Sequence, residues 1–224
     1  MFPARVAYQW LSPPGVALSG IEGSIWSGRA SAAQVSRLFL HNLEWRMRPG
    51  ALLTGRFGFR FAADAASGFV AGDVALGTGG SIGLSDFSAS LSLQDLQELI
   101  GMPGLGGMVN LQFSRLELDN GIPVAANGRV EVVNLVAPLI HRSSIGGFRA
   151  EFFTQEGGVM ASVEDVNAVI DLAGSLQPTG DRSYQFIAQI APKANTPANL
   201  REQMQFLGSA NERGQYEMRL EWQL

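Results

Sequence analysis

The residues that could perform catalysis in this chain are few and far apart in the sequence. There are two histidines, His41 and His141, and no cysteine. A hydrolytic triad needs a histidine next to a nucleophile and oriented by a carboxylate. Residues 79–83 fit the pattern G-x-S-x-G, with Ser81 in the middle, but this pattern marks a nucleophile only on a turn from a strand into a helix. The surrounding sequence predicts a glycine-rich turn with no helix after it, so we expect no nucleophile here.

Metal and phosphate sites have little support either. The chain has no H-x-x-x-H pair, no EF-hand spacing and no helical cluster of carboxylates. The acidic pairs Glu117/Asp119 and Glu164/Asp165 are expected to be solvated. The glycine-rich stretch GIEGSIWSGRA, residues 20–30, fits neither G-x-G-x-x-G nor a P-loop, and no alternation of strands and helices surrounds it. The sequence therefore predicts a protein that is not an enzyme and binds no cofactor or metal.

The charge of the chain is low and unevenly distributed. Charged residues make up 16% of the chain, against roughly 25% in typical globular domains, and 27 of 224 residues are glycine. Residues 1–60 hold seven arginines and two glutamates, a net charge of +5, whereas residues 61–224 hold nine basic and eighteen acidic residues, a net charge of −9. The basic end suits contact with an anionic surface, or equally a solvated strand face with scattered arginines. Because the arginines alternate with apolar residues, nucleic acid is a poor candidate partner.

The elements that would position any site are mainly β-strands. Apolar and polar residues alternate with a period of two in seven segments, which predicts antiparallel strands that cover a core on one face. These segments are 42–48, 56–61, 87–91, 109–113, 148–152, 184–190 and 216–224. We expect a curved, mostly antiparallel sheet, open as a groove or half-barrel, because the strands vary in length without the even spacing of a closed barrel.

Turns and short helices separate the strands. Turn signals occur at 120–121, 127–128, 146–147, 157–158 and 178–180. One helix is predicted at 93–100 with Ser92 as N-cap, and a second at 199–207 with Asn199 as N-cap and Gly208 after its end. We expect residues 1–224 to form a single domain. Residues 62–68 interrupt the pattern, which fits either a weak subdivision or a hairpin loop.

The tryptophans are the most informative apolar residues. Trp26, Trp45 and Trp222 lie in alternating or glycine-flanked segments. We expect them in the core, or some of them lining an open groove. A strand is predicted to enter at 16–18 and continue through 25–26, with Trp26 as a buried anchor and the glycines allowing close approach beside its indole. A one-sided sheet with few helices must be covered by a partner, by a lipid-like ligand or by itself.

Several segments resemble, in order, those of the type II secretion system protein N family. Residues 18–30 (LSGIEGSIWSGRA) are similar to the family opening L-x-G-x-x-G-T-L-W-x-G-x-A, with serine and isoleucine in place of its threonine and leucine. Residues 43–49 (LEWRMRP) and 52–56 (LLTGR) resemble L-x-W-x-L-x-P and L-L-x-G, and residues 199–208 and 214–218 resemble the terminal helix and strand. The signature and packing residues are Gly20, Gly23, Trp26, Gly28, Leu43, Trp45, Pro49, Leu53, Gly55, Gly208 and Tyr216.

This resemblance implies an inner-membrane protein of Gram-negative bacteria with one membrane helix and a β-rich domain in the periplasm. No stretch here reaches the ~20 apolar residues of a membrane span, and the first residues lack the apolar region of a signal peptide. The family helix would end just before residues 2–5, so we expect this chain to be the periplasmic domain without its anchor. The resemblance implies an accessory component of the machine that exports folded proteins through an outer-membrane secretin, with no catalytic activity.

Two functional hypotheses follow. In the first, the domain is an interaction module whose partners are the periplasmic domains of the inner-membrane platform and the N-terminal domains of the secretin. Its candidate interaction edge is the terminal strand, with Tyr216, Met218, Leu220 and Trp222. In the second, the apolar face of the sheet binds a lipid or another apolar ligand. An enzyme is a distant third.

Overall fold

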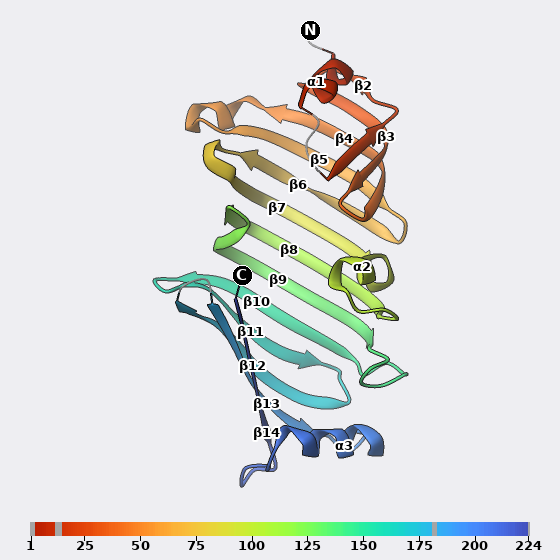
Figure 1. Ribbon diagram of the computed structural model, residues 1–224, viewed down its shortest axis with the longest axis vertical. Helices are drawn as coiled ribbons and strands as arrows, with labels where there is room; N and C mark the ends of the chain where they lie inside the picture. The colour runs from red at the N-terminus through yellow and green to blue at the C-terminus, as the bar shows by residue number, and fades with distance from the viewer. Residues whose placement is uncertain (1–2, 12–14, 181–182, 224) are drawn as a thin grey trace.

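The chain forms one long antiparallel sheet. The computed structural model describes residues 3–11, 15–180 and 183–223, in which fourteen strands belong to a single sheet with the order β1-β3-β4-β5-β6-β7-β8-β9-β10-β11-β12-β13-β14, and β2 pairs with β3 beside this path. Every neighbouring pair is antiparallel. The strands stack along the long axis of the molecule and twist from one end to the other (Figure 1).

The element bounds follow the chain. The strands are β1 (Val16–Ser19), β2 (Glu22–Gly23), β3 (Ser27–Val35), β4 (Leu38–Arg48), β5 (Phe57–Ala65), β6 (Gly68–Leu76), β7 (Ser81–Ser92), β8 (Gly106–Asp119), β9 (Ile122–Val136), β10 (Gly147–Gln155), β11 (Gly158–Val166), β12 (Ile170–Gly180), β13 (Ser183–Pro192) and β14 (Tyr216–Gln223). The α-helices are α1 (Ala4–Leu11), α2 (Leu93–Ile100) and α3 (Ala198–Met204), and the 3-10 helices are η1 (Pro49–Thr54), η2 (Thr78–Gly80) and η3 (Gln205–Leu207).

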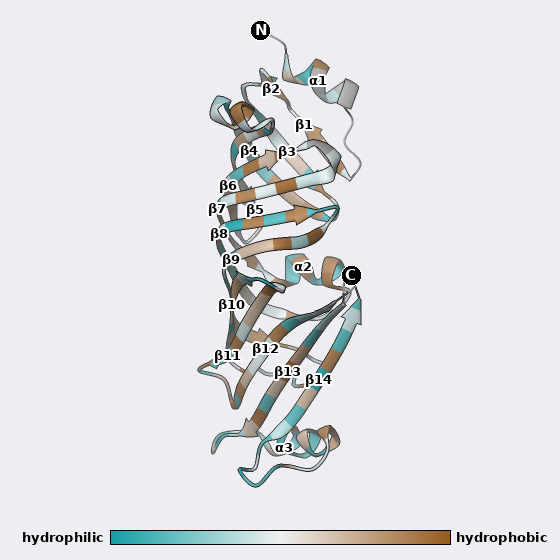
Figure 2. Cartoon of the chain, turned by 90° about the vertical axis from the view of Figure 1, so that its left-hand side faces the viewer, coloured by the Kyte–Doolittle hydropathy of each residue, from teal (hydrophilic) through white to brown (hydrophobic). Residues whose placement is uncertain are grey.

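The predicted open antiparallel sheet is confirmed. Each of the seven alternating segments coincides with a strand, except that Arg56 precedes β5 and residue 224 lies outside the described residues. Figure 2 shows hydrophobic and hydrophilic residues alternating along strands of the sheet. β1 and β14 lie at opposite ends of the strand order, so the sheet does not close into a barrel. Most strands are joined to the next by a short turn, and longer connections follow β7, β9 and β13. Short connections favour pairing between neighbours in sequence.

The turns agree with the sequence in part. Asn120 and Gly121 connect β8 to β9 with φ angles of 50° and 82°, the left-handed conformation that an Asn-Gly hairpin turn requires. Residues 62–68 span the tip of the β5–β6 hairpin. Residues 127–128 are not a turn but lie inside β9, and residues 178–180 lie at the end of β12, where the register with β13 shifts.

The described residues contain three α-helices, whereas the sequence predicted at most two. α2 begins as expected, because the Ser92 hydroxyl accepts a hydrogen bond from the N–H of Gln94 at 3.2 Å. α3 has Pro197 rather than Asn199 as its N-cap, and Gly208 with φ 118° follows η3 as predicted. Helix α1 was not predicted. No helix in the described part of the chain has the length and apolar character needed to cross a bilayer.

The helices cover only one end of the apolar face of the sheet. α2 connects β7 to β8 and α3 lies between β13 and β14, and both occur at the same strand ends, which we call the helix side (Figure 1). Leu93 packs there in a cluster with Leu40, Leu91 and Val109, and Leu200 and Met204 of α3 belong to a second cluster. The opposite strand ends, which we call the open side, carry η1, η2 and the β8–β9 turn. The main core therefore lies on the helix side.

The strand predicted to run from 16 through 26 does not exist as one element. β1 ends at Ser19, Gly20 turns the chain with φ 63°, and β2 is only two residues long. The N–H of Ser24 donates to the carbonyl of Ser27 at 2.9 Å, so Ile25 and Trp26 form the turn between β2 and β3.

Candidate interaction surfaces

The first edge of the sheet is closed by helix α1. The hydroxyl of Tyr8 donates a hydrogen bond to the carbonyl of Val16 at 3.0 Å and accepts one from the N–H of Leu18 at 3.1 Å. Both of these backbone groups belong to β1, the first strand of the order. Tyr8 therefore occupies backbone positions that could otherwise pair with another strand.

The last edge of the sheet is open. β14 pairs along its full length with β13, from Tyr216 opposite Ile190 to Gln223 opposite Ser183, and no described strand borders its other side. Trp222 stacks on Tyr184 with ring centroids 6.4 Å apart, yet it is 42% exposed, and Leu220 is 51% exposed. The prediction that Trp222 is a core residue is therefore wrong, because no strand of the described residues covers the outer side of β14.

A row of apolar side chains lies uncovered on the open side. Phe57 pairs with Leu76, and Leu76 pairs with Ile82, so the three side chains share one face of β5, β6 and β7. They are 59%, 43% and 36% exposed, respectively. We call these three residues the apolar row. They remain exposed because α2 and α3 lie at the other ends of the strands.

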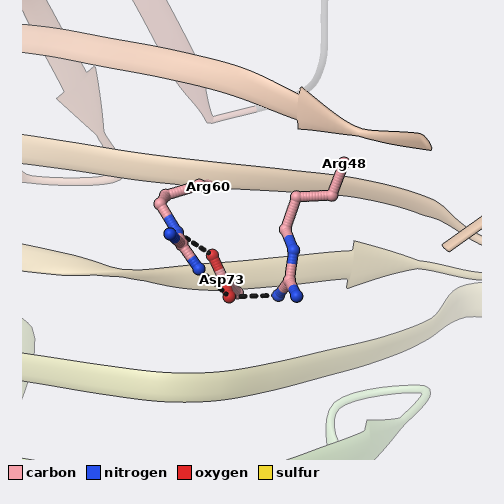
Figure 3. A network of polar contacts seen from close by, with 3 residues as sticks. All are labelled: Arg48, Arg60 and Asp73. Atoms are coloured by element: carbon pink, nitrogen blue, oxygen red, sulfur yellow. Dashed lines mark hydrogen bonds and ion pairs between the residues drawn. The ribbon is translucent and has the colours of Figure 1, made fainter. Parts of the chain in front are cut away.

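On the opposite face, Asp73 is the most buried charged residue described. Its carboxylate accepts hydrogen bonds from Arg60 at 2.8 and 3.0 Å and also bonds to Arg48, as Figure 3 shows. Asp73 lies directly opposite Arg60 in the register of β5 and β6. The hydrogen bonds from Arg60, together with the charge of Arg48, lower the pKa of Asp73 against the opposing effect of burial. Arg60 and Asp73 are brought together only by the strand register, so the sequence pattern alone does not indicate this site.

A groove of about 830 Å³ runs beside this ion pair over β3, β4 and β5. Four arginines line it, Arg29, Arg46, Arg48 and Arg60. Arg29 bonds to Glu22 at 2.6 and 2.9 Å, and Arg48 and Arg60 bond to Asp73. Arg46 alone makes no ion pair within the described residues. Three of the seven arginines of residues 1–60 thus pair with carboxylates of the same sheet.

The glycine-rich signature packs around Trp45 and not around Trp26. The indole N–H of Trp45 donates to the carbonyl of Ser24 at 3.2 Å, and a methyl group on Gly28 would lie 2.5 Å from the indole ring. Gly28 is therefore needed for close approach of β3 to this ring. Trp26 is 48% exposed in the β2–β3 turn, so the prediction of a buried anchor at Trp26 is wrong.

The other signature residues lie at bends of the chain. Gly20, Gly23 and Gly55 have φ angles of 63°, 88° and 70°, a region that favours glycine. Pro49 starts η1, which Gly55 ends.

The remaining apolar signature residues differ in burial. Leu43 of β4 packs against the core cluster around α2, and Tyr216 packs against the cluster around α3. Leu53 is 91% exposed, so it contributes little to packing.

A second buried ion pair joins Asp165 of β11 to Lys193 beyond β13. Asp165 was expected to be solvated, but only 10% of its side chain is exposed, and it also accepts from the N–H of Leu172 at 2.9 Å. Burial raises the pKa of Asp165, but the hydrogen bonds from Lys193 and from the backbone of Leu172 outweigh it and lower the pKa below its ordinary value. Asp165 of β11 thus contacts both the backbone of β12 and the residue that follows β13.

The residues considered for catalysis lie on separate elements. His41 is an exposed residue of β4 that pairs with Asp64 near the β5–β6 turn, whereas Ser81 begins β7, three strands away in the sheet and at the opposite strand ends. His141 lies in the connection between β9 and β10, where its Nδ1 is 3.1 Å from both the N–H and the carbonyl of Ser143. In the described residues no three His, Asp or Glu side chains gather as metal ligands would.

Comparison with known proteins gives a consistent result. The profile of the family "Type II secretion system (T2SS), protein N" matches residues 14–219 of this chain. The type II secretion system protein N of Vibrio cholerae serotype O1 (strain ATCC 39315 / El Tor Inaba N16961) is 27% identical over 230 residues, covering 99% of this chain and 91% of the relative. No solved structure matches the chain. The profile covers nearly all strands of the sheet, from β1 into β14, and the chain therefore belongs to the type II secretion system protein N family.

Proposed function

We propose that this chain is an accessory, non-catalytic component of the type II secretion system and acts as an interaction module on the periplasmic side of the inner membrane. Membership of the family supports a role in this secretion system. The observation that carries the interaction role is the apolar row of Phe57, Leu76 and Ile82, which no other described element covers. Exposed apolar patches of this kind mark contact sites for proteins or membranes.

The apolar row offers enough surface for a specific contact. Full burial of a Phe, Leu or Ile side chain contributes roughly 1.5–3 kcal/mol, and each of these three is between about one third and three fifths exposed. Covering the row with a partner would therefore contribute on the order of 2–4 kcal/mol before the entropic cost of association. Such a contact suits an accessory component that joins an assembly held together by other interfaces.

The partners we propose are those that the family resemblance implies, the periplasmic domains of the inner-membrane platform and the N-terminal domains of the secretin. A second route for contact is strand addition at the free edge of β14, near Leu220 and Trp222. Both surfaces lie on the same sheet.

Crosslinking in cells tests this proposal. A photoreactive amino acid at position 57 or 76 should capture components of the secretion system. Phe69 is the matched control, because it is also an aromatic residue, is 46% exposed, and pairs with Asp64 and Ser90 on the other face. The same probe at position 69 should give little product. The proposal fails if neither the apolar row nor β14 gives a product with any secretion component.

The second candidate function, binding of a lipid or another apolar ligand, is favoured by the aromatic residues along the same face. Phe61 lies 6.5 Å from Phe87, and Phe113 lies 5.7 Å from Phe152, measured between ring centroids. These rings continue the apolar face from β5 to β10. Native mass spectrometry of the purified protein would detect a bound lipid, and Phe57→Glu should then remove it. A spectrum that shows only the protein mass, before and after lipid extraction, would leave the protein-contact proposal as the better account.

A further inference from the structure

The two edge strands of the sheet, β1 and β14, differ in how their outer backbone groups are paired. Tyr8 of α1 bonds to the backbone of Val16 and Leu18 and so closes the β1 edge. At the other end, β14 pairs only with β13, and in the described part of the chain no strand lies on its outer side. A free edge carries a row of backbone donors and acceptors that can pair with another strand. The sequence of β14 indicates which strand would fit.

The charged residues of β14 are complementary to those of a second β14 in antiparallel orientation. If the pair is centred on Leu220, Arg219 lies opposite Glu221 of the second copy, and Glu221 lies opposite Arg219 of the second copy. The outermost pair, Glu217 and Gln223, brings no like charges together. Opposite charges directly across an antiparallel pair stabilise it, and like charges destabilise it. The centre at Leu220 thus gives two favourable charge pairs over seven residues.

The apolar residues of β14 are complementary in the same register. Met218 lies opposite Trp222 of the second copy, and the two Leu220 side chains face each other at the centre. Met218, Leu220 and Trp222 all lie on the face that carries the core, because they pair with Ala188, Phe186 and Tyr184 of β13. Pairing would therefore continue the apolar face into the second copy and cover Leu220 and Trp222, now 51% and 42% exposed.

Neighbouring registers are less favourable. In a symmetric antiparallel pair one residue faces its own copy at the centre. A centre at Arg219 places the two Arg219 side chains together and sets Glu217 opposite Glu221. A centre at Glu221 places two carboxylates together. A centre at Met218 also pairs Arg219 with Glu217. However, only residues 216–220 of each copy are then paired, because β14 begins at Tyr216.

From this complementarity we propose that the occupant of the β14 edge is β14 of a second copy of this chain, antiparallel and centred on Leu220. Arg219 now forms an exposed ion pair with Glu217 at 3.3 Å and would gain Glu221 of the second copy as an additional partner. Seven residue pairs bury less area than the ~1,600 Å² of a standard interface, so the expected dissociation constant is about 10 μM to 1 mM. The dimer is therefore expected to form at high local concentration.

This inference rests on the proposed function and deepens it, because it names the partner at one of the two contact surfaces. The dimer and the proposed function can nevertheless fail separately. If the chain dimerises but contacts no secretion component, the inferred dimer is supported and the proposed function is contradicted. If the apolar row crosslinks to secretion components while the chain stays monomeric, the proposed function is supported and the dimer is contradicted. A photoreactive probe on β14 that captures a secretion component and never a second copy would also overturn the inference.

Charge reversal tests the register in the purified chain. Sedimentation velocity between about 5 and 500 μM should show concentration-dependent dimerisation. Arg219→Glu alone and Glu221→Arg alone should each raise the dissociation constant at least about tenfold, since each sets like charges opposite each other twice. The double variant Arg219→Glu/Glu221→Arg should restore dimerisation, and an equimolar mixture of the two single variants should form a mixed dimer. Failure of both the double variant and the mixture to associate would overturn the proposal.

A disulfide provides an independent measure of the register. The chain contains no cysteine, so an introduced one has no competing partner. Residues directly opposite each other in an antiparallel pair have Cβ atoms about 4.5–5.5 Å apart, close to the spacing of a disulfide. Leu220→Cys should therefore form a covalent dimer on oxidation, whereas Arg219→Cys, which faces Glu221 of the second copy, should form little. Equal yields from the two variants, or a wild-type chain that stays monomeric at every concentration, would contradict the proposed pairing.

Discussion

Asp73 on β6 lies directly opposite Arg60 on β5, and its buried carboxylate accepts two hydrogen bonds from the exposed guanidinium of that arginine. Arg48, at the end of β4, reaches the same carboxylate. The cluster thus joins three consecutive strands on the polar face, beside the groove and near the open side, where η1 contacts β5 while α2 and α3 lie at the other strand ends. We infer that it stabilises this part of the sheet in place of a second layer.

Removing the charge of Asp73 should destabilise the protein. Asp73→Asn is expected to lower the free energy of unfolding at pH 7 by about 1–3 kcal/mol, the usual contribution of a hydrogen bond to a charged group. Since the folded-state pKa lies below the unfolded value of about 3.9, this stability is fully present above that value and is lost as the pH falls through the folded pKa. Urea unfolding of wild type and variant from about pH 7 to 3 should show the difference shrinking with acid.

Asp171 supplies the control for this experiment. It is an exposed carboxylate on β12. Asp171→Asn should change the stability by less than about 0.5 kcal/mol at any of these pH values. An Asp73→Asn variant as stable as Asp171→Asn, or a difference that persists unchanged at low pH, would show that the ion pair does not stabilise the sheet.

A methyl group at Gly28 should be poorly tolerated. Gly28→Ala would place a Cβ atom 2.5 Å from the Trp45 ring and 2.6 Å from the carbonyl oxygen of Glu22, so the strands must move apart. We expect a loss of about 1–3 kcal/mol in thermal or chemical unfolding. Gly50→Ala is the matched control, because nothing lies within 4 Å of its added Cβ atom. A double variant with Trp45→Phe should lose less than the sum of the single changes, since part of the clash is with the indole.

The tryptophans of the signature should differ in their contribution to stability. Trp26→Ala is expected to cost only about 1 kcal/mol, because nearly half of its side chain is already exposed, whereas Trp45→Ala should cost about 2–4 kcal/mol. Differential scanning calorimetry of both variants measures this order directly. A larger loss for Trp26→Ala than for Trp45→Ala would mean that the β2–β3 turn, and not the contact of Trp45 with β3, holds this end of the sheet.

The contrast between these two tryptophans shows what the sequence could and could not predict. The alternation around Trp45 identifies β4 and the face that it turns to the core, and similar alternation in six other segments predicts further strands and the open sheet. Trp26 lies in the glycine-rich segment of residues 20–30, and its exposure depends on the hydrogen bond between Ser24 and Ser27 that turns the chain. Local periodicity contains no information on such a turn.

The features that depend on strand register were also beyond the sequence. Asp73 and Arg60 are thirteen residues apart, and only the β5–β6 pairing places them opposite each other. The prediction that Asp165 is solvated was wrong because its partner, Lys193, lies two strands further along the chain. Only the arrangement of the strands brings the two residues together. Helix α1 could not be predicted from its eight residues alone, since its placement depends on the contact of Tyr8 with β1.

Removing the hydroxyl of Tyr8 should reopen the first edge of the sheet. Tyr8→Phe keeps the ring but deletes both hydrogen bonds to β1, so the N–H of Leu18 loses its acceptor. Hydrogen exchange at Leu18 should become faster by roughly tenfold, in line with the loss of about 1 kcal/mol for one hydrogen bond. The amides of β13 and β14, at the far end of the strand order, should exchange as in wild type and provide the internal control. If the exchange rate of Leu18 does not change, then α1 does not protect β1, and the two edges of the sheet are equally free to pair with other chains.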